Sequence, residues 1–217
     1  VIDDAIDEAA EKDDLWDDVS EEEIQNMVSG KTETSTNSGT VEGDLNVGGI
    51  VGSMAVENSV DPEDDITEVG ERSLKFHYET RAVLNQCINR GAVTGKKDSI
   101  GGAAGRMDLG YILACQNYGM IESTDGSCVG GIAGYSASTI RGSYSKCMVS
   151  GTDYVGGIAG SANNLYDNVA YISVTYAEMY SGSIAGYTDQ DAEVSGNRFV
   201  VNGTAGVNGV SYAGRAE

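Results

Sequence analysis

The sequence predicts a mainly β protein, a right-handed parallel β-solenoid of about five turns with a helical cap at its N-terminus. Three observations predict this fold. A short motif recurs at a nearly constant period. Glycine is abundant, at 30 of 217 residues, whereas proline occurs once. Valine, isoleucine, threonine and tyrosine are common between the glycines, which favours short strands joined by tight turns over helices.

Residues 1–30 are predicted to be an acidic helical cap, the end of a longer upstream segment. They carry 12 acidic residues and one lysine, about half of the net charge of −21. Ser20 and Glu23 form a capping box that predicts a second short helix, which Gly30 would end. Such a cap would cover the first turn of a solenoid, and the alternative is an acidic binding arm. The expected apolar positions are Ile2, Ile6, Ala9 and Trp16, then Ile24, Met27 and Val28.

The first repeated motif reads Val-Gly-Gly-Ile-Ala-Gly in its clearest copies. It occurs at 47–52, 100–105, 129–134 and 155–160, with a weaker copy at 181–186. The first glycines, at 48, 101, 130, 156 and 182, are separated by 53, 29, 26 and 26 residues. A period of 26 to 29 residues fits one solenoid turn of three short strands and three corners. Residues 31–217 are therefore assigned to the solenoid.

A second motif precedes the first and is fullest at 87–95, where it begins Cys-Ile-Asn-Arg-Gly-Ala-Val. Residues at alternate positions share a character, which predicts a strand with one face inside. We expect residues such as Val93 and Ile132 to point inward and to stack on their counterparts in the neighbouring turns. The Gly-Gly pair is expected to supply positive φ angles and close backbone approach at a corner. Further copies lie at 37–43, 115–121 and 143–151, with degenerate copies at 168–174 and 195–203.

The long first interval contains an insert at about 57–80. The insert is predicted to be a loop that projects from one face, and the alternative is a degenerate extra turn. Its carboxylates are weak candidates for calcium ligands, because they lack the alternating spacing of a calcium loop, and a solvated acidic loop is the competing interpretation. They are Asp61, Glu63, Asp64 and Asp65. His77 and Tyr78 are candidate binding residues of the same insert.

The four cysteines and two asparagines are expected to be structural. Cys87 and Cys115 occupy equivalent positions, as do Asn89 and Asn117, so each pair should lie on adjacent turns. Parallel stacked side chains are poorly aimed for a disulfide, which predicts free buried thiols. The asparagines are predicted to form a hydrogen-bonded ladder, and a row of amides facing a ligand is the alternative. Cys128 and Cys147 have no obvious partner.

Tyrosine is frequent, at 12 residues, and recurs through the turns. A row of exposed tyrosines would make a contact surface for carbohydrate or protein, because the ring combines a flat apolar body with a polar tip. Tyr135 and Tyr187 are the candidates within the turns. The alternative is that the tyrosines pack at corners.

The two motifs together resemble the GLUG repeat, which occurs in tandem on large secreted and cell-surface bacterial proteins, including putative adhesins and some IgA-specific proteases. The resemblance covers about residues 35–210. It implies an extracellular, cell-surface or secreted location. It supplies no catalytic residue, because the repeats are not the catalytic part of those proteases.

The net charge and the absence of catalytic motifs argue against several classes of function. A net charge of −21 argues against nucleic acid and anionic membranes as partners, and no apolar run approaches a membrane span. The repeats contain no nucleophile elbow, metal-binding histidine pair or phosphate loop. We therefore expect no enzyme and no cofactor, but a monomeric structural or spacer module between flanking domains. The alternative is an adhesin-like module that binds glycan or a host or bacterial surface protein through the insert or a tyrosine-lined face.

Overall fold

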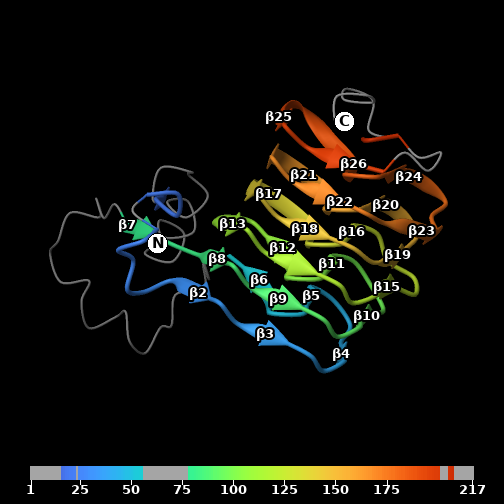
Figure 1. Ribbon diagram of the computed structural model, residues 1–217, viewed down its shortest axis with the longest axis horizontal. Coiled ribbons are helices and arrows are strands. Elements are labelled where there is room, and N and C mark those ends of the chain that lie inside the picture. The colour runs from blue at the N-terminus through green and yellow to red at the C-terminus, as the bar shows by residue number, and fades with distance from the viewer. Residues whose placement is uncertain (1–15, 23, 56–77, 201–204, 208–217) are drawn as a thin grey trace, which may run out of the picture.

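The computed structural model describes residues 16–22, 24–55, 78–200 and 205–207, and every regular element in them is a strand. The chain passes repeatedly through four parallel sheets, named here sheets I to IV in chain order, and its turns stack into one column (Figure 1). Sheets II and III have five strands each, so about four full turns separate the first pass from the last. The predicted parallel β-solenoid is confirmed.

The four sheets are built from short strands that recur in the same order. Sheet I contains β3 (Thr36–Asn37), β9 (Ile88–Asn89), β14 (Gln116–Asn117), β18 (Tyr144–Ser145), β22 (Val169–Ala170) and β26 (Arg198–Phe199). Sheet II contains β4 (Val41–Glu42), β10 (Val93–Gly95), β15 (Ile121–Ser123), β19 (Met148–Ser150) and β23 (Ser173–Tyr176). Sheet III contains β5 (Val47–Gly48), β11 (Ile100–Gly101), β16 (Val129–Gly130), β20 (Asp153–Gly156) and β24 (Met179–Gly182). Sheet IV contains β2 (Lys31–Glu33), β6 (Val51–Met54), β8 (Val83–Asn85), β12 (Ala104–Met107), β13 (Tyr111–Leu113), β17 (Ala133–Arg141), β21 (Ala159–Tyr166) and β25 (Ala185–Ser195).

Each turn therefore crosses four sheets, whereas the sequence predicted three strands per turn. The additional division lies at the Gly-Gly motif, where sheet III ends and sheet IV begins after a corner of two residues, as between β11 and β12. Backbones of adjacent turns approach too closely there for side chains. A Cβ added to Gly102 would lie 2.2 Å from the carbonyl oxygen of Gly131 and 2.4 Å from the Cγ of Asn117. The predicted close approach is confirmed.

The positive φ angles, however, are not at the Gly-Gly pair, and that prediction is wrong. Most of them occur just before sheet I and just before sheet III, largely at residues other than glycine, whereas Gly30 and Gly110 lie just before the sheet IV strands β2 and β13. At these positions the backbone hydrogen-bonds to the next turn, as when the N–H of Ala114 donates to the oxygen of Arg141 at 2.9 Å. The ladder between turns thus stabilises a conformation that side chains disfavour. The residues are Thr34, Gln86, Ala114, Gly142, Asp167 and Gly196 before sheet I, and Asn46, Ser99, Cys128, Tyr154 and Tyr180 before sheet III.

The insert is not an extra turn. Gly48 pairs directly with Gly101, so the first two copies of the glycine motif lie on adjacent turns despite the 53 residues between them. Among the described residues, the strands of the solenoid end one turn at β6 and begin the next at β8. Most of the insert lies outside the described residues, and its last part forms β7 (Tyr78–Thr80).

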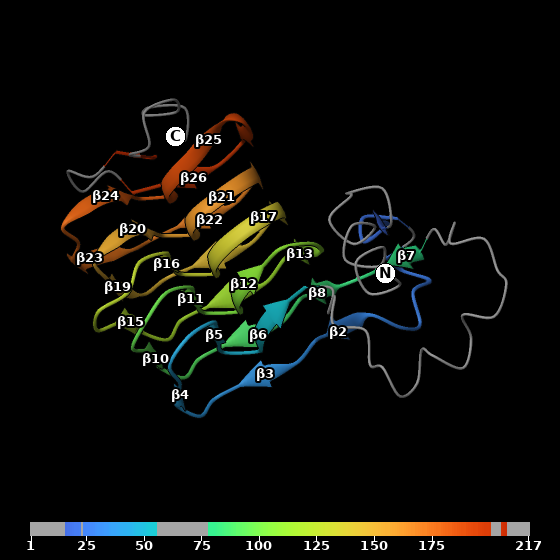
Figure 2. The same cartoon turned by 180° about the vertical axis from the view of Figure 1, so that it is seen from behind.

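The N-terminal segment is not helical where the structure describes it, which corrects the predicted cap. β1 (Trp16–Asp18) pairs with β7, and the two lie beside β8 at one side of the solenoid (Figures 1 and 2). Ser20 caps no helix: its hydroxyl donates to the Asp18 carboxylate and accepts the Ala82 N–H at 2.9 Å. Val28, expected to be buried, is 99% exposed. Pairing with β7 satisfies the backbone of a segment whose repelling acids weaken a helix. Ile2, Ile6, Ala9 and Glu23 lie outside the described residues.

The core consists of stacked inward columns, as the repeat predicts. Val93 pairs with Val41 and Ile121, and Ile121 pairs with Val149. The second column contains Ile132, which is fully buried, as are its counterparts in the turns above it. Each inward side chain therefore buries its surface against the turns above and below, so that stability comes from contacts between neighbouring turns.

Candidate functional site

Sheet I presents two outward columns of side chains to solvent. One column lies within the strands, where residues alternate between inward and outward. The second follows each strand directly, and its register is kept by backbone hydrogen bonds such as that from the N–H of Tyr118 to the oxygen of Asn89 at 2.8 Å. We call these twelve positions the sheet I face. They are Thr36, Ile88, Gln116, Tyr144, Val169 and Arg198 in the first column, and Ser38, Arg90, Tyr118, Lys146, Tyr171 and Val200 in the second.

Three tyrosines form a ladder along this face. The ring centroids of Tyr118 and Tyr144 are 5.7 Å apart with the planes tilted by 47°. The step from Tyr144 to Tyr171 is nearly identical, at 5.8 Å and 48°. The guanidinium of Arg90 lies 5.0 Å from the centre of the Tyr118 ring, a cation–π contact, and the Tyr118 hydroxyl donates to the Gln116 side chain at 2.8 Å. Rings that are 26 and 27 residues apart in the sequence are thus brought into contact by the repeat.

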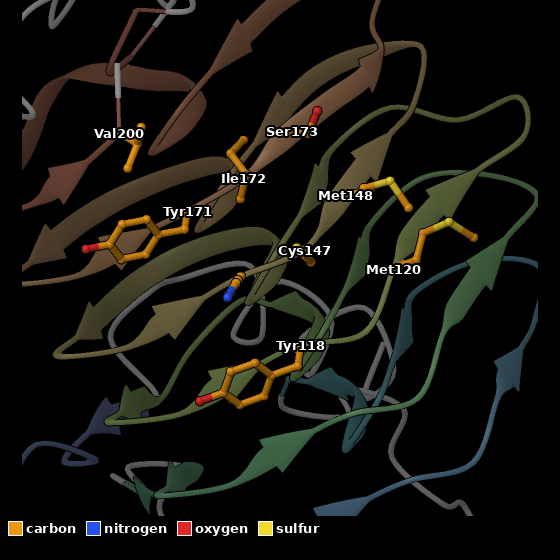
Figure 3. A pocket seen from close by; sticks show the side chains of 9 residues that line it. Tyr118, Met120, Cys147, Met148, Tyr171, Ile172, Ser173 and Val200 are labelled. Carbon is orange, nitrogen blue, oxygen red and sulfur yellow. The ribbon is translucent and has the colours of Figure 1, made fainter. Parts of the chain in front are cut away.

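An apolar groove adjoins the tyrosines at the edge between sheets I and II. It has a volume of about 520 Å³. Met120 and Met148 lie on one side of it and Tyr118 and Tyr171 on the other (Figure 3). Both methionines are exposed, at 39% and 48%, where a side chain of this kind would ordinarily be covered. The remaining lining residues are Lys146, Cys147, Ile172, Ser173 and Val200.

The sheet I face is basic within a strongly acidic chain. None of its twelve positions is Asp or Glu, whereas three are Arg or Lys. Arg90, Lys146 and Arg198 are exposed and form no ion pair with another described residue. By contrast, exposed acids gather at the corner between sheets II and III, where Asp44 binds Lys97 at 2.7 Å. The face therefore differs from its surroundings in both charge and aromatic content.

Burial raises the pKa of Tyr144, with smaller contributions from Tyr118 and Tyr171. The phenol accordingly stays protonated at neutral pH and can donate a hydrogen bond. In the groove, burial raises the pKa of the Cys147 thiol to about 11. Because the thiolate is the nucleophile, this cysteine lacks the activation that covalent chemistry requires.

Three other tyrosines form a separate cluster, so the tyrosines of the turns do not make the single row that was one of the two expectations. Tyr154 and Tyr180 stack with centroids 5.1 Å apart and planes within 7°, and Tyr187 meets Tyr154 edge-on at 5.6 Å. Tyr135 lies two turns from Tyr187 in the same column, with Ser161 between them. The ring of Tyr135 packs under Arg106, at 4.8 Å. Hence the two tyrosine candidates of the turns do not touch one another.

The asparagines form the ladder that their shared position predicts. Asn37 donates to the Oδ1 of Asn89, and Asn89 donates to the Oδ1 of Asn117, each at 2.8 Å. Asn117 also binds both the oxygen and the N–H of Gly119, at 3.0 and 3.1 Å. Asn89 and Asn117 are fully buried. Their amides point inward and satisfy the corner, so they do not form a row facing a ligand.

All four cysteines are free, and Cys87 and Cys115 are fully buried on adjacent turns. Each thiol donates to backbone oxygens of its surroundings, as Cys115 does to Leu84 at 3.6 Å. The neighbouring thiol and burial together raise the pKa of Cys115 above its ordinary value. Burial is also the main reason that the pKa of Cys128 is raised to about 11. The environments of Cys115, Cys128 and Cys147 are therefore those of structural thiols.

The insert candidates cannot be placed. Asp61, Glu63, Asp64, Asp65 and His77 lie outside the described residues, and Tyr78 is described only by its backbone. Within the described ranges, no group of three or more His, Cys, Asp and Glu side chains could hold a metal ion. The described part also contains no helix long and apolar enough to cross a membrane.

The sequence did not single out the residues that make the sheet I face distinctive: Arg90, Lys146, Met120 and Met148. The alternation of inward and outward residues along each strand could have identified them. Because the asparagine position is buried, the residues on either side of it must point outward. No family model, curated protein or solved structure matches the chain. The candidate site therefore stands on its geometry alone.

Proposed function

We propose that the chain is a non-catalytic structural module of a bacterial cell-surface or secreted protein, a stiff spacer between other domains. The observation that carries the proposal is the continuous pairing of sheets I to III, in which every described turn pairs with the next and the register shifts only between Val149 and Ser150 of β19. Parallel ladders with stacked side chains resist bending, because each turn is held on both sides. The resemblance to GLUG repeats supports the bacterial surface location.

Distance measurements between the first and last turns test the spacer. Glu42 and Tyr176 occupy one column of sheet II, four turns apart. Spin labels introduced there through unnatural amino acids should give one narrow distance distribution, centred near the ~19 Å that four strand spacings predict, apart from the label arms. A broad distribution in buffer would rule out a stiff spacer.

The sheet I face supports a second candidate, an adhesin-like module that binds glycan. The tyrosines of this face expose their rings to water, and the methionines of the adjoining groove expose their thioethers. Exposed aromatic and apolar groups of this kind are typical of a contact surface. An array of glycans and host-matrix proteins, probed with and without Ca²⁺, tests this candidate. Saturable binding that Tyr118→Ala with Tyr171→Ala abolishes would support it. Binding that survives both substitutions would place the ligand elsewhere, as at the 57–80 insert.

A further inference from the structure

The second column of the sheet I face alternates between cations and aromatic rings. In successive turns its residues are Arg90, Tyr118, Lys146 and Tyr171. Arg198 continues the cationic series in the neighbouring column, two turns beyond Lys146. Within this column like groups therefore recur every second turn, a distance of ~10 Å along the solenoid axis, and Tyr144 of the first column adds a ring on the same turn as Lys146. This period belongs to the folded molecule, because it arises only when turns stack in register.

We propose that the sheet I face binds an anionic polysaccharide in which a carboxylate-bearing sugar alternates with a neutral sugar, with its chain parallel to the solenoid axis. The proposal deepens the glycan-binding candidate and rests on it. The repeat of ~10 Å is about the length of one disaccharide in an extended polysaccharide. One sugar of each pair would lie over a tyrosine, and the next would place its carboxylate beside a cation.

The contacts suit this ligand. The flat C–H face of a pyranose packs on an aromatic ring, and Tyr118 and Tyr171 are 38% and 47% exposed. Arg90 and Lys146 are exposed and have no acidic partner among the described residues, so a carboxylate need not displace one. The apolar groove lies next to both tyrosines and suits the methyl of an N-acetyl group.

Charge density distinguishes this ligand from other polyanions. Nucleic acid carries a phosphate about every 3.4 Å along each strand of a duplex, and the net charge of −21 opposes so dense an array. A glycan with one carboxylate per disaccharide carries a charge only every ~10 Å, which is the spacing of the cations on this face. The structure thus matches a sparse polyanion with neutral rings between its charges.

Direct binding measurements with defined oligosaccharides test the proposal. The probe is a hyaluronan decasaccharide, in which uronate and N-acetylhexosamine alternate, and calorimetry is run at about 0.05 M and about 0.3 M NaCl. We expect saturable binding that weakens several-fold at the higher salt, because exposed ion pairs are screened. Carboxyl-reduced hyaluronan, a polygalacturonate decamer and a ten-residue oligothymidylate should each bind at least tenfold more weakly.

Variants assign the contacts. Arg90→Gln with Lys146→Gln should weaken hyaluronan binding about 3- to 20-fold and reduce its salt dependence, as two exposed ion pairs would. Tyr118→Ala with Tyr171→Ala should weaken it about tenfold or more. The matched controls, Lys97→Gln and Tyr135→Ala on other faces, should leave affinity within twofold. All variants change exposed or half-buried side chains, and thermal melts verify their folding.

The outcomes separate the proposal from the candidate on which it rests. If no glycan on the array or in solution binds, both are wrong. If carboxyl-reduced hyaluronan or another neutral glycan binds as well as hyaluronan and only the tyrosine variants weaken it, the glycan-binding candidate stands and the anionic, alternating ligand is overturned. Equal or tighter binding of polygalacturonate or oligothymidylate also overturns it.

Discussion

At the scale of single residues, the left-handed positions are the least expected feature of the molecule. Two occur in most turns, and of the thirteen described residues with positive φ only Gly30, Gly110, Gly142 and Gly196 are glycines. A side chain in this conformation costs about 1–2 kcal/mol. The solenoid accommodates that cost because hydrogen bonds to the next turn leave the backbone no alternative that keeps the register.

Ala114→Gly should therefore stabilise the protein. Ala114 has a φ of 51°, and the equivalent position one turn later is Gly142. Relief of the left-handed strain outweighs the greater freedom of glycine in the unfolded chain, so we expect a gain of about 0.5 kcal/mol in the free energy of unfolding by urea. The control Ala133→Gly, in a buried strand, should destabilise by about 1 kcal/mol or more. A loss with Ala114→Gly would show that the strain is absent.

Gly102→Ala should be severely destabilising. Its Cβ would meet the backbone of Gly131, which cannot move without breaking the register of two turns. We expect a loss of about 3 kcal/mol or more, measured by thermal and urea unfolding. Gly142→Ala is the matched control: nothing lies within 4 Å of its added Cβ, so only the cost of its φ of 60° applies, about 1 kcal/mol. Equal losses would refute the steric explanation.

Buried thiols should make stability fall at alkaline pH. The pKa of Cys128 and of Cys147 is raised to about 11 in the folded protein, against about 8.5 in an unfolded chain. The folded state retains these protons longer, so their contribution to stability is complete below about pH 8.5 and is lost as the pH rises toward 11. The double variant Cys128→Ala with Cys147→Ala should lose several kcal/mol less over this range than the parent chain, because each pKa unit corresponds to about 1.4 kcal/mol per thiol. If the free energy of unfolding falls with pH equally in the parent chain and the double variant, these two thiols are not the cause of the alkaline loss of stability.

At the scale of elements, polar rather than apolar side chains stack on the inner side of the first three strands of sheet I. The asparagine ladder links three turns through β3, β9 and β14 and binds the corner that follows each strand. Further along the same sheet, the position is occupied by Ser145, Ala170 and Phe199. The ladder therefore belongs to the N-terminal half of the solenoid.

Asn117→Ala tests the contribution of the ladder. The substitution leaves the N–H of Gly119 and the amide of Asn89 without a shared partner in a buried site. We expect a loss of about 2–3 kcal/mol. Gln116→Ala, which changes the outward neighbour in the same strand, should alter the free energy of unfolding by less than about 0.5 kcal/mol. A small effect of Asn117→Ala would mean that water replaces the ladder.

The whole molecule carries a net charge of −21, and its described ion pairs are few and mostly exposed. Repulsion among carboxylates should therefore limit its stability at low ionic strength. Raising NaCl from about 0.01 M to about 0.1 M should increase the melting temperature by several degrees, because the Debye length shortens from about 30 Å to about 10 Å. The control is a thermal melt in a non-ionic solute at the same osmolality as the NaCl solution. A melting temperature independent of salt would mean that the charges are already too far apart to interact.

The sequence alone was sufficient for the repeated architecture. The period of the glycine motif predicts the turns, and alternation around Val93 and Ile132 predicts which side chains are inside. These features are local, since each depends on residues a few positions apart. The same locality explains the error at Trp16, which was expected on a helix and instead lies in β1, paired with β7 some 62 residues further along the chain.

The tertiary structure alone decided which outward residues become neighbours. Arg90, Tyr118, Lys146 and Tyr171 are each about one repeat apart in the chain, and no local pattern joins them. Only the register between turns places them in one column, with Met120 and Met148 beside them. Register is set by the buried columns and the hydrogen-bonded ladder of the whole stack. The candidate binding face is thus a consequence of the core, and could be recognised only after the turns had been aligned.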